Sequence, residues 1–277
     1  DVYKRQAPWS GRGAEVILAC RDQTKGQAAV AKIKNAHPQA KVRLFALDLA
    51  DLEQVRDCAA ELYQELGHID VLINNAGILR DKSFVKMTQD DWDKVVAVHL
   101  TGSQICSKTV WPIMREQGYG RIVMTTSTSG LYGNFGQANY GAAKMAVAGL
   151  MNTLCLEGEK YDIKVNCIAP TAATRMTEDL MPPEVLAMLE PKEITPAVLF
   201  LASTQAPTHR ILLAGAGCYA MVRLMESEGV YLSDEERNVD GVAAHFEQLG
   251  NMVHRSLRQP AATLPLRQVK KCAQCAS

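Results

Sequence analysis

A tyrosine and a lysine four residues apart, Tyr140 and Lys144, could carry out proton transfer, and Ser127 lies thirteen residues before the tyrosine. Side chains at positions i and i+4 of a helix share one face, so the phenol and the ammonium would be neighbours. A nearby cation favours the phenolate, and we expect the pKa of Tyr140 to be lowered toward working pH. Such a tyrosine can exchange a proton with an alcohol or carbonyl oxygen that a serine hydroxyl holds. Most pairs with this spacing are solvated helix faces, so the surroundings must decide.

The composition is that of a chain with enough apolar residues for a full core. The chain has 277 residues, of which 47% are hydrophobic, and it carries 30 basic and 30 acidic side chains. This balance gives no reason to expect nucleic acid or an anionic membrane surface as a partner. No apolar run reaches the ~18 residues of a membrane span, and no secretory signal precedes the first strand, so we expect a cytoplasmic protein.

The eight cysteines give no sign of a disulfide framework or a metal site. Six are single residues, mostly in apolar stretches, and we expect reduced, buried thiols. Cys272 and Cys275 form a CxxC at the C-terminal end, but without a second pair this is a poor zinc site. We therefore expect no metal, and we interpret the CxxC as part of a frayed tail.

Apolar strand-like runs alternate with helical stretches from residue 13 onward. We expect strands at 15–20, 42–47, 71–73, 121–125 and 164–168, and a last strand with its turn at 210–217. We expect helices at 25–35, 90–111, 139–157 and within 233–257, and one that Asp51 caps and whose apolar stripe runs from Val55 to Leu66. Continuous apolar strands separated by helices predict a doubly wound, Rossmann-like α/β fold with a parallel sheet. Ligands of this fold bind beyond the carboxyl ends of the strands. We expect one such domain over residues 11–220, followed by a helical extension and tail over 221–277.

Several short motifs occur in the order typical of one protein family. They are Asp48-Leu49, Asn74-Asn75-Ala76-Gly77, Ser127, Tyr140-x-x-x-Lys144 and Asn166-Cys167-Ile168-Ala169-Pro170. The set resembles the short-chain dehydrogenase/reductase family over roughly residues 11–220. After Gly77, residues 98–103 and 129–140 are similar to the (3R)-hydroxyacyl-CoA dehydrogenase part of peroxisomal multifunctional β-oxidation enzymes and to their bacterial single-domain relatives. Residues 13–77 resemble retinol-dehydrogenase-like members more closely, and a recombined reading frame is an alternative interpretation.

The resemblance implies hydride transfer between a nicotinamide cofactor and a secondary alcohol or ketone, of the 3-hydroxyacyl-CoA type. Tyr140 would be the general acid/base. Lys144 would lower its pKa and hold the nicotinamide ribose, and Ser127 would orient the substrate oxygen. His99 stands where most of the family has asparagine, and it is either a member of a proton relay or a core histidine.

The resemblance also implies which residues contact the cofactor. Besides Tyr140 and Lys144, these are Arg21, Asp48, Leu49, Asn75, Ala76, Gly77, Ile168 and Thr174. Arg21 follows the strand whose end distinguishes the two cofactors, and an arginine there favours the 2′-phosphate. We therefore expect NADP(H). NAD(H) is the alternative, because the multifunctional enzyme is NAD-linked.

One departure from the family puts activity of this chain in doubt. The family opens with a strand and a TGxxxGxG turn whose backbone amides meet the pyrophosphate, and the chain contains no such motif. We expect the first strand, the turn and most of the first helix to be missing. The alternatives are then a hydroxyacyl-CoA-type enzyme, a retinol- or general carbonyl-directed reductase, and a non-catalytic chain. We also expect a homo-oligomer that associates through the helix over 139–157.

Overall fold

The structure is a computed structural model, and it describes residues 14–172, 184, 189–227 and 229–250. They belong to two compact units, one reaching Met221 and the other beginning at Val222. The strands are β1 (Glu15–Cys20), β2 (Lys41–Ala46), β3 (Val71–Asn74), β4 (Gly120–Thr125), β5 (Ile163–Pro170), β6 (Ile211–Gly215) and β7 (Cys218–Val222). The α-helices of the first unit are α2 (Gln23–Ala36), α3 (Leu52–Leu66), α4 (Gln89–Val96), α5 (Gly102–Gln117), α6 (Thr128–Tyr132), α7 (Ala138–Gly158) and α9 (Thr195–Leu201).

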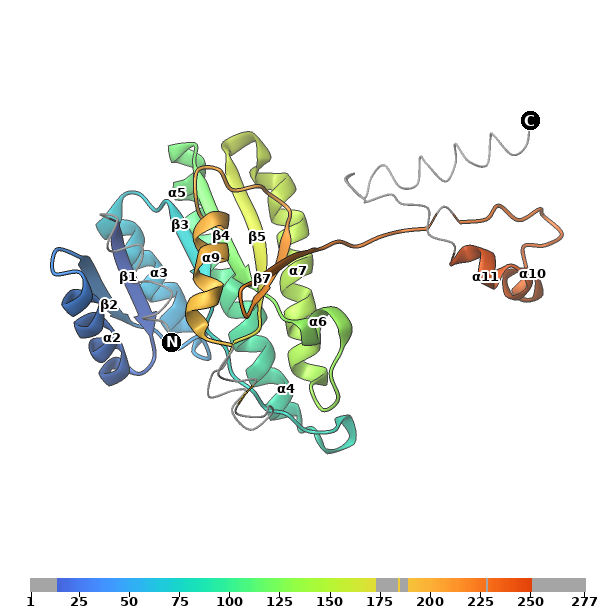
Figure 1. The fold of residues 1–277 in the computed structure, drawn as a ribbon, viewed down its shortest axis with the longest axis horizontal. Helices are drawn as coiled ribbons and strands as arrows, with labels where there is room; N and C mark the ends of the chain where they lie inside the picture. The colour runs from blue at the N-terminus through green and yellow to red at the C-terminus, as the bar shows by residue number, and fades with distance from the viewer. Residues whose placement is uncertain (1–13, 173–183, 185–188, 228, 251–277) are drawn as a thin grey trace. The chain divides into compact units, whose positions relative to one another are not determined.

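The larger sheet has the order β3-β4-β5-β6-β7, and β3 to β6 run parallel. Figure 1 shows α9 on one face of this sheet and α5 and α7 on the other. Val123 and Ile168 pack with Val198 and Leu201 in one buried cluster on the α9 side. Because successive side chains of a strand point to opposite faces, their neighbours along β4 and β5 face the other layer. The expected doubly wound α/β fold is confirmed.

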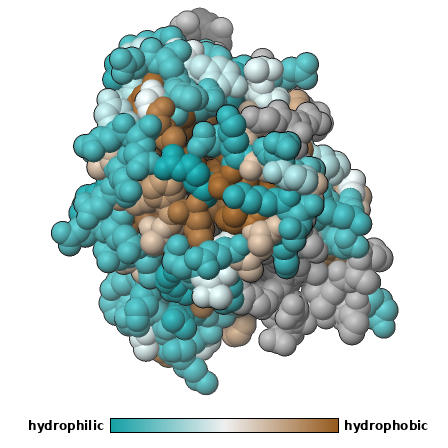
Figure 2. Space-filling model, turned by 90° about the vertical axis from the view of Figure 1, so that its left-hand side faces the viewer, coloured by the Kyte–Doolittle hydropathy of each residue, from teal (hydrophilic) through white to brown (hydrophobic). Residues whose placement is uncertain are grey.

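The first two strands form a separate parallel pair, β1 with β2, which α2 covers. Val16, Leu18 and Ile33 are buried in its core. Within the described residues, β1 pairs only with β2 and β3 only with β4, so no strand bridges the two sheets. Figure 2 shows the face on the side of α2 and β2, where apolar side chains gather at the centre among hydrophilic ones. The side chains of β1 and β2 are accordingly only partly buried at several positions, such as Ile17 and Phe45.

Three expected elements differ from the structure. The helix expected over 90–111 is divided into α4, a π-helical segment η2 (Ala97–Thr101) and α5, which continues to Gln117. A π segment inserts one extra residue per turn and rotates the side chains that follow, a device common at functional sites. The run 210–217 is not the last strand, because the hairpin partner β7 follows it.

The second unit differs from the single helix expected within 233–257. It contains two short helices, α10 (Val239–Ala244) and α11 (Phe246–Leu249), separated at His245. Asn238 caps α10 by accepting a hydrogen bond from the backbone N–H of Gly241 at 2.9 Å. Glycine within a six-residue helix is unfavourable by about 1 kcal/mol relative to alanine, which agrees with the shortness of α10. In the described part of the chain, no helix is both long and apolar enough to cross a bilayer.

Candidate active site

Ser127 follows β4 and begins the short helix α6. Its side chain accepts a hydrogen bond from the backbone N–H of Ser129 at 3.2 Å, as expected for a serine at a helix N-cap. Gly130 lets this turn approach α7 closely, because a Cβ there would lie 2.8 Å from the Cβ of Lys144. The absence of a side chain at one position therefore brings Ser127 against the helix that carries the tyrosine and the lysine.

Tyr140 and Lys144 lie on one face of α7, as their spacing predicts. The ammonium of Lys144 is 5.6 Å from the centroid of the Tyr140 ring. Lys144 is 3% exposed and donates a hydrogen bond from Nζ to the backbone oxygen of Thr125 at 2.7 Å. Thr126 donates from its hydroxyl to the backbone oxygen of Lys144, also at 2.7 Å, so the end of β4 fixes this turn of α7.

The pKa of Tyr140 differs from the sequence-based expectation. Burial of the ring raises this pKa, a hydrogen bond with the Ser127 side chain opposes the rise, and the negative charge of Asp81 adds to it. Desolvation outweighs any lowering of this pKa by Lys144, whose ammonium donates to the backbone oxygen of Thr125. The tyrosine therefore holds its proton at neutral pH in this structure. The Ser127 side chain is nevertheless near enough to the Tyr140 hydroxyl to oppose this rise.

His99 lies in the π segment and is 2% exposed. Its Nε2 is 2.8 Å from the backbone oxygen of Ile78 and 3.1 Å from the backbone nitrogen of the same residue, so either neutral tautomer makes one hydrogen bond. Nδ1 has no partner among the described residues. Burial, together with the charge of Lys144, lowers the pKa of His99 to about 3. The imidazole is therefore neutral at any ordinary pH, and its ring is edge-on to Tyr140.

The Asn75-Ala76-Gly77 segment follows β3 and lies against these groups. The Asn75 side-chain oxygen accepts a hydrogen bond from the Thr125 hydroxyl at 3.4 Å. A Cβ at Gly77 would be only 2.4 Å from Cε1 of His99, so the imidazole occupies the space that any other residue would need. Gly77 is therefore required by packing, in addition to any contact of its backbone with a cofactor.

The structure brings together Arg21, the first residue after β1, and Asp48, the second residue after β2. Arg21 Nη1 and Asp48 Oδ2 are 3.8 Å apart, and the Arg21 side chain is 70% exposed. The carboxylate of the next residue, Asp22, does not take part in this ion pair. It caps α2 and pairs with Lys25 at 2.7 Å. Leu49 packs against Gly102 at the start of α5.

Of the two remaining predicted cofactor residues, the structure describes Ile168 but not Thr174. Ile168 is 1% exposed within β5, and its backbone oxygen accepts a hydrogen bond from Thr126 at 2.8 Å. Its side chain belongs to the sheet core. Thr174 lies outside the described residues.

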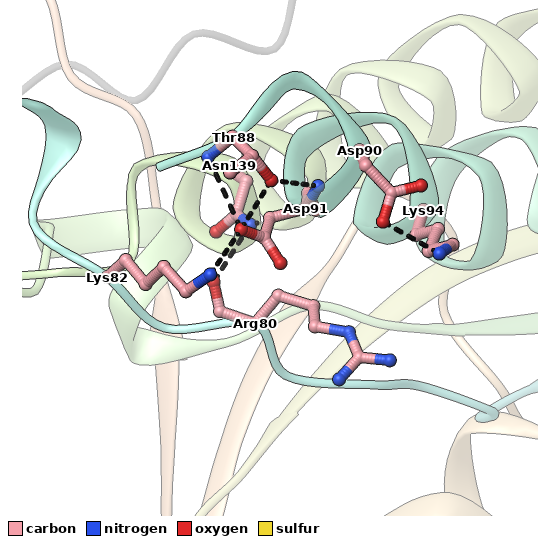
Figure 3. Close-up of polar contacts among 7 residues, drawn as sticks. All are labelled: Arg80, Lys82, Thr88, Asp90, Asp91, Lys94 and Asn139. Atoms are coloured by element: carbon pink, nitrogen blue, oxygen red, sulfur yellow. Dashed lines mark hydrogen bonds and ion pairs between the residues drawn. The ribbon is translucent and has the colours of Figure 1, made fainter. Parts of the chain in front are cut away.

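A polar cluster beside Tyr140 was missed by the sequence reasoning (Figure 3). Asn139 is fully buried, and its Nδ2 donates to the backbone oxygens of Arg80 at 3.2 Å and Asp91 at 3.1 Å. Its Oδ1 accepts from the backbone nitrogen of Tyr140 at 2.7 Å. One side chain thus joins the segment after β3, the first turn of α4 and the start of α7.

Asp91 is the charged centre of this cluster. It accepts hydrogen bonds from the Lys82 ammonium at 2.8 Å and from the Thr88 hydroxyl at 2.6 Å. These two hydrogen bonds lower the pKa of Asp91 to about 2. Thr88 and Asp91 form a capping box at the start of α4, and the Thr-x-x-Asp pattern was the signal available in the sequence.

Comparison with known proteins agrees with this fold and site. The short chain dehydrogenase family matches the chain over residues 9–184, and the chain belongs to that family. It is therefore an oxidoreductase of the class that uses nicotinamide cofactors, as the sequence motifs indicated. Peroxisomal multifunctional enzyme A of Dictyostelium discoideum is 53% identical over 169 residues, which are 61% of this chain and 38% of that protein.

Two further relatives differ in how much of their length the chain covers. Acetoacetyl-CoA reductase of Allochromatium vinosum is 33% identical over 204 residues, which are 70% of this chain and 83% of that protein. The solved structure of full-length peroxisomal multifunctional enzyme type 2 from Drosophila melanogaster matches with a TM-score of 0.81 at 29% identity, over 98% of this chain and 47% of that one. The chain thus spans less than half the length of the multifunctional relatives.

Proposed function

We propose that the chain catalyses hydride transfer between a nicotinamide cofactor and the 3-oxo or 3-hydroxy carbon of an acyl-CoA thioester. The observation that carries the proposal is the position of the Tyr140 ring, whose centroid is 5.6 Å from the buried ammonium of Lys144, together with the nearby Ser127 side chain that opposes the rise of the Tyr140 pKa. Ser127 and Tyr140 would both hold the substrate oxygen. In the reductive direction, Tyr140 would give its proton to that oxygen, and in the oxidative direction it would accept one. The bound cofactor supplies or accepts the hydride at its nicotinamide ring.

The raised pKa of Tyr140 means that the phenol is in its protonated form at neutral pH. A phenol that is protonated at neutral pH is ready to donate to a carbonyl oxygen, whereas oxidation needs a phenolate. Lys144 would stabilise the phenolate left after the transfer and hold the nicotinamide ribose. His99 would act near Tyr140 as a neutral group, because an imidazolium is inaccessible above about pH 3.

The described residues include groups suited to the nicotinamide and adenine ends of the cofactor but none suited to its pyrophosphate. The exposed guanidinium of Arg21 could meet a 2′-phosphate, and the Asp22 carboxylate is already engaged as a helix cap. This favours NADP(H) over NAD(H). The remaining contacts would come from Asp48, Leu49, Asn75, Ala76, Gly77, Ile168 and Thr174. Among the described residues, no glycine-rich strand-to-helix turn is available for the pyrophosphate.

The substrate class rests on the relatives. An acetoacetyl-CoA reductase and the multifunctional enzymes are among the proteins that the chain resembles, so a 3-oxoacyl-CoA is the first substrate to test. A retinoid or a simple ketone is the second candidate, because residues 13–77 resemble retinol-dehydrogenase-like members of the family.

A spectrophotometric assay at millimolar NADPH or NADH tests the proposal. Acetoacetyl-CoA should be reduced faster than retinal or cyclohexanone, and faster with NADPH than with NADH. Reduction of retinal alone would move the assignment to the second candidate. No oxidation of either cofactor with any substrate would overturn the proposed activity of this chain.

We further propose a homo-oligomer in the cytoplasm. Apart from Glu157 near its C-terminal end, the exposed residues of α7 are uncharged: Ala142, Met145, Gly149, Thr153 and Leu156. An uncharged helix face of this length suits contact with a second copy. Free thiols such as Cys58 and Cys155 suit a reducing compartment. Light scattering tests the first proposal, and imaging of a fluorescent fusion tests the second against the peroxisomal location named for the relatives.

A further inference from the structure

The segment that follows β3 carries several charged side chains beside the site, and most of them are matched. Lys82 pairs with Asp91 at 2.8 Å, and the Asp91 side chain is only 10% exposed. Asp81 accepts a hydrogen bond from Gln137 at 2.6 Å. On the neighbouring helix, Lys94 pairs with Asp90 at 2.7 Å.

Arg80 is the exception in this segment. Figure 3 shows its side chain extending away from the polar cluster, and it forms no ion pair with any of the residues that the structure describes. Its backbone is nevertheless fixed, because its carbonyl oxygen accepts from the buried Asn139 at 3.2 Å. Two residues earlier, Ile78 is bonded to His99. Arg80 therefore has a backbone fixed against Asn139, the residue before Tyr140, and a guanidinium without an ion pair among the described residues.

Large apolar side chains are exposed on the same segment as Arg80 and on the segment bonded to it. Phe84 is 75% exposed and Phe135 is 91% exposed. They lie on two segments that are joined by a hydrogen bond from the Lys82 backbone nitrogen to the Gly136 oxygen at 2.9 Å. The two joined segments thus carry a guanidinium without an ion pair and two exposed aromatic rings, features that suit a ligand with an uncharged arm and an anionic end. The neighbouring Asp81 carboxylate accepts a hydrogen bond from the neutral Gln137 side chain.

We propose that Arg80 binds a phosphate of the coenzyme A moiety of the substrate and so distinguishes CoA thioesters from small carbonyl compounds. This inference rests on the proposed function and deepens it by assigning a residue to recognition of the carrier. A guanidinium forms paired hydrogen bonds with phosphate oxygens. The pantetheine arm would run along the exposed apolar surface near Phe84 and Phe135 toward Ser127 and Tyr140.

Calorimetric titration with free coenzyme A tests the site without turnover. Arg80→Gln should weaken coenzyme A binding by about 10- to 100-fold, as expected for the loss of a charge-assisted hydrogen bond. Pantetheine, which has no phosphate, should bind the wild type and the variant equally. Lys94→Gln is the matched control, since it removes a nearby cation that already has a partner, and it should leave both affinities unchanged.

An Arg21→Gln variant separates this site from the cofactor site, which would also attract a phosphate. Loss of coenzyme A binding in Arg21→Gln but not in Arg80→Gln would place coenzyme A in the cofactor site and overturn the proposal. Equal affinities of the wild type and Arg80→Gln, or no coenzyme A binding by the wild type, would overturn it as well. If coenzyme A binding depends on Arg80 while acetoacetyl-CoA is not reduced, the proposed activity fails and the binding site stands.

Discussion

The imidazole of His99 is edge-on to the phenol ring of Tyr140, with the ring centroids 5.1 Å apart and the planes at 90°. Burial shifts the pKa values of these two groups in opposite directions: it lowers that of His99 and raises that of Tyr140. Desolvation disfavours the charged form of each, so both are neutral at pH 7. The site is therefore set for transfer of one proton from the phenol, with a histidine that does not compete for it.

Tyr140→Phe should reduce the rate of acetoacetyl-CoA reduction by about 100- to 10,000-fold, because the substitution removes only the acid/base hydroxyl. The midpoint of urea unfolding should change little, since the ring remains. Steady-state kinetics at saturating cofactor measures the effect. Tyr132→Phe is the control, because Tyr132 is an exposed tyrosine on the preceding turn. A near-normal rate for Tyr140→Phe would remove this residue from the mechanism.

The pKa of His99 predicts how stability depends on pH. In the folded protein this pKa is about 3, below the ordinary value of 6.5. The unfolded chain therefore binds a proton first as the pH falls, and His99 destabilises the fold by ~1.4 kcal/mol per pH unit between about pH 6 and pH 3. Above pH 6.5 this effect is absent. Urea unfolding at pH 7 and pH 5 should show a larger loss for the wild type than for His99→Gln.

Arg21→Asp should shift the cofactor preference from NADP(H) toward NAD(H). The guanidinium that could meet a 2′-phosphate is replaced by a carboxylate that can accept hydrogen bonds from ribose hydroxyls. We expect the ratio of kcat/KM values for NADPH and NADH to fall by about 10- to 100-fold. Lys34→Asp, at the far end of α2, makes the same charge change and should leave the ratio as it is. If the ratio of kcat/KM values is the same in Arg21→Asp as in the wild type, Arg21 does not contact the cofactor and is only a surface charge.

The pattern of apolar runs predicted the strands well, because buried parallel strands are continuous hydrophobic segments. The expected strand at 15–20 coincides with β1, and the i, i+4 spacing correctly placed Tyr140 and Lys144 on one face of α7. Spacing contains no information about burial, however. The direction of the Tyr140 pKa was therefore wrong, since desolvation exceeds any effect of the lysine.

Contacts between distant segments account for most of what the sequence did not show. Asn139 bonds to Arg80 and Asp91, which are 59 and 48 residues away, and nothing in the local sequence predicts these pairs. The π segment at His99 also has no sequence signal, because its neighbours on both sides continue a helical pattern. Only the capping box of Thr88 and Asp91 could have been read directly.

Asn139→Ala should destabilise the fold and lower activity together. It leaves two backbone oxygens and the Tyr140 nitrogen without their partner in a fully buried place, and each such group costs about 1–3 kcal/mol. We expect a loss of at least 2 kcal/mol in urea unfolding and a reduced kcat, because the first turn of α7 is no longer fixed. Asn134→Ala, at an exposed position of the preceding loop, should cost less than 1 kcal/mol.

Cofactor binding by the 277-residue chain should be weak, with a dissociation constant well above the micromolar range for both NADPH and NADH. The sequence contains no glycine-rich strand-to-helix turn, so the pyrophosphate lacks the backbone amides and helix N-terminus that usually hold it. Within the described residues, the edges of β1 and β3 also have no strand between them, which leaves backbone groups without partners at the place where the two sheets should join. Calorimetric titration measures the affinity directly. Micromolar binding of either cofactor would show that another segment builds the pyrophosphate site, and the expected weakness would be wrong.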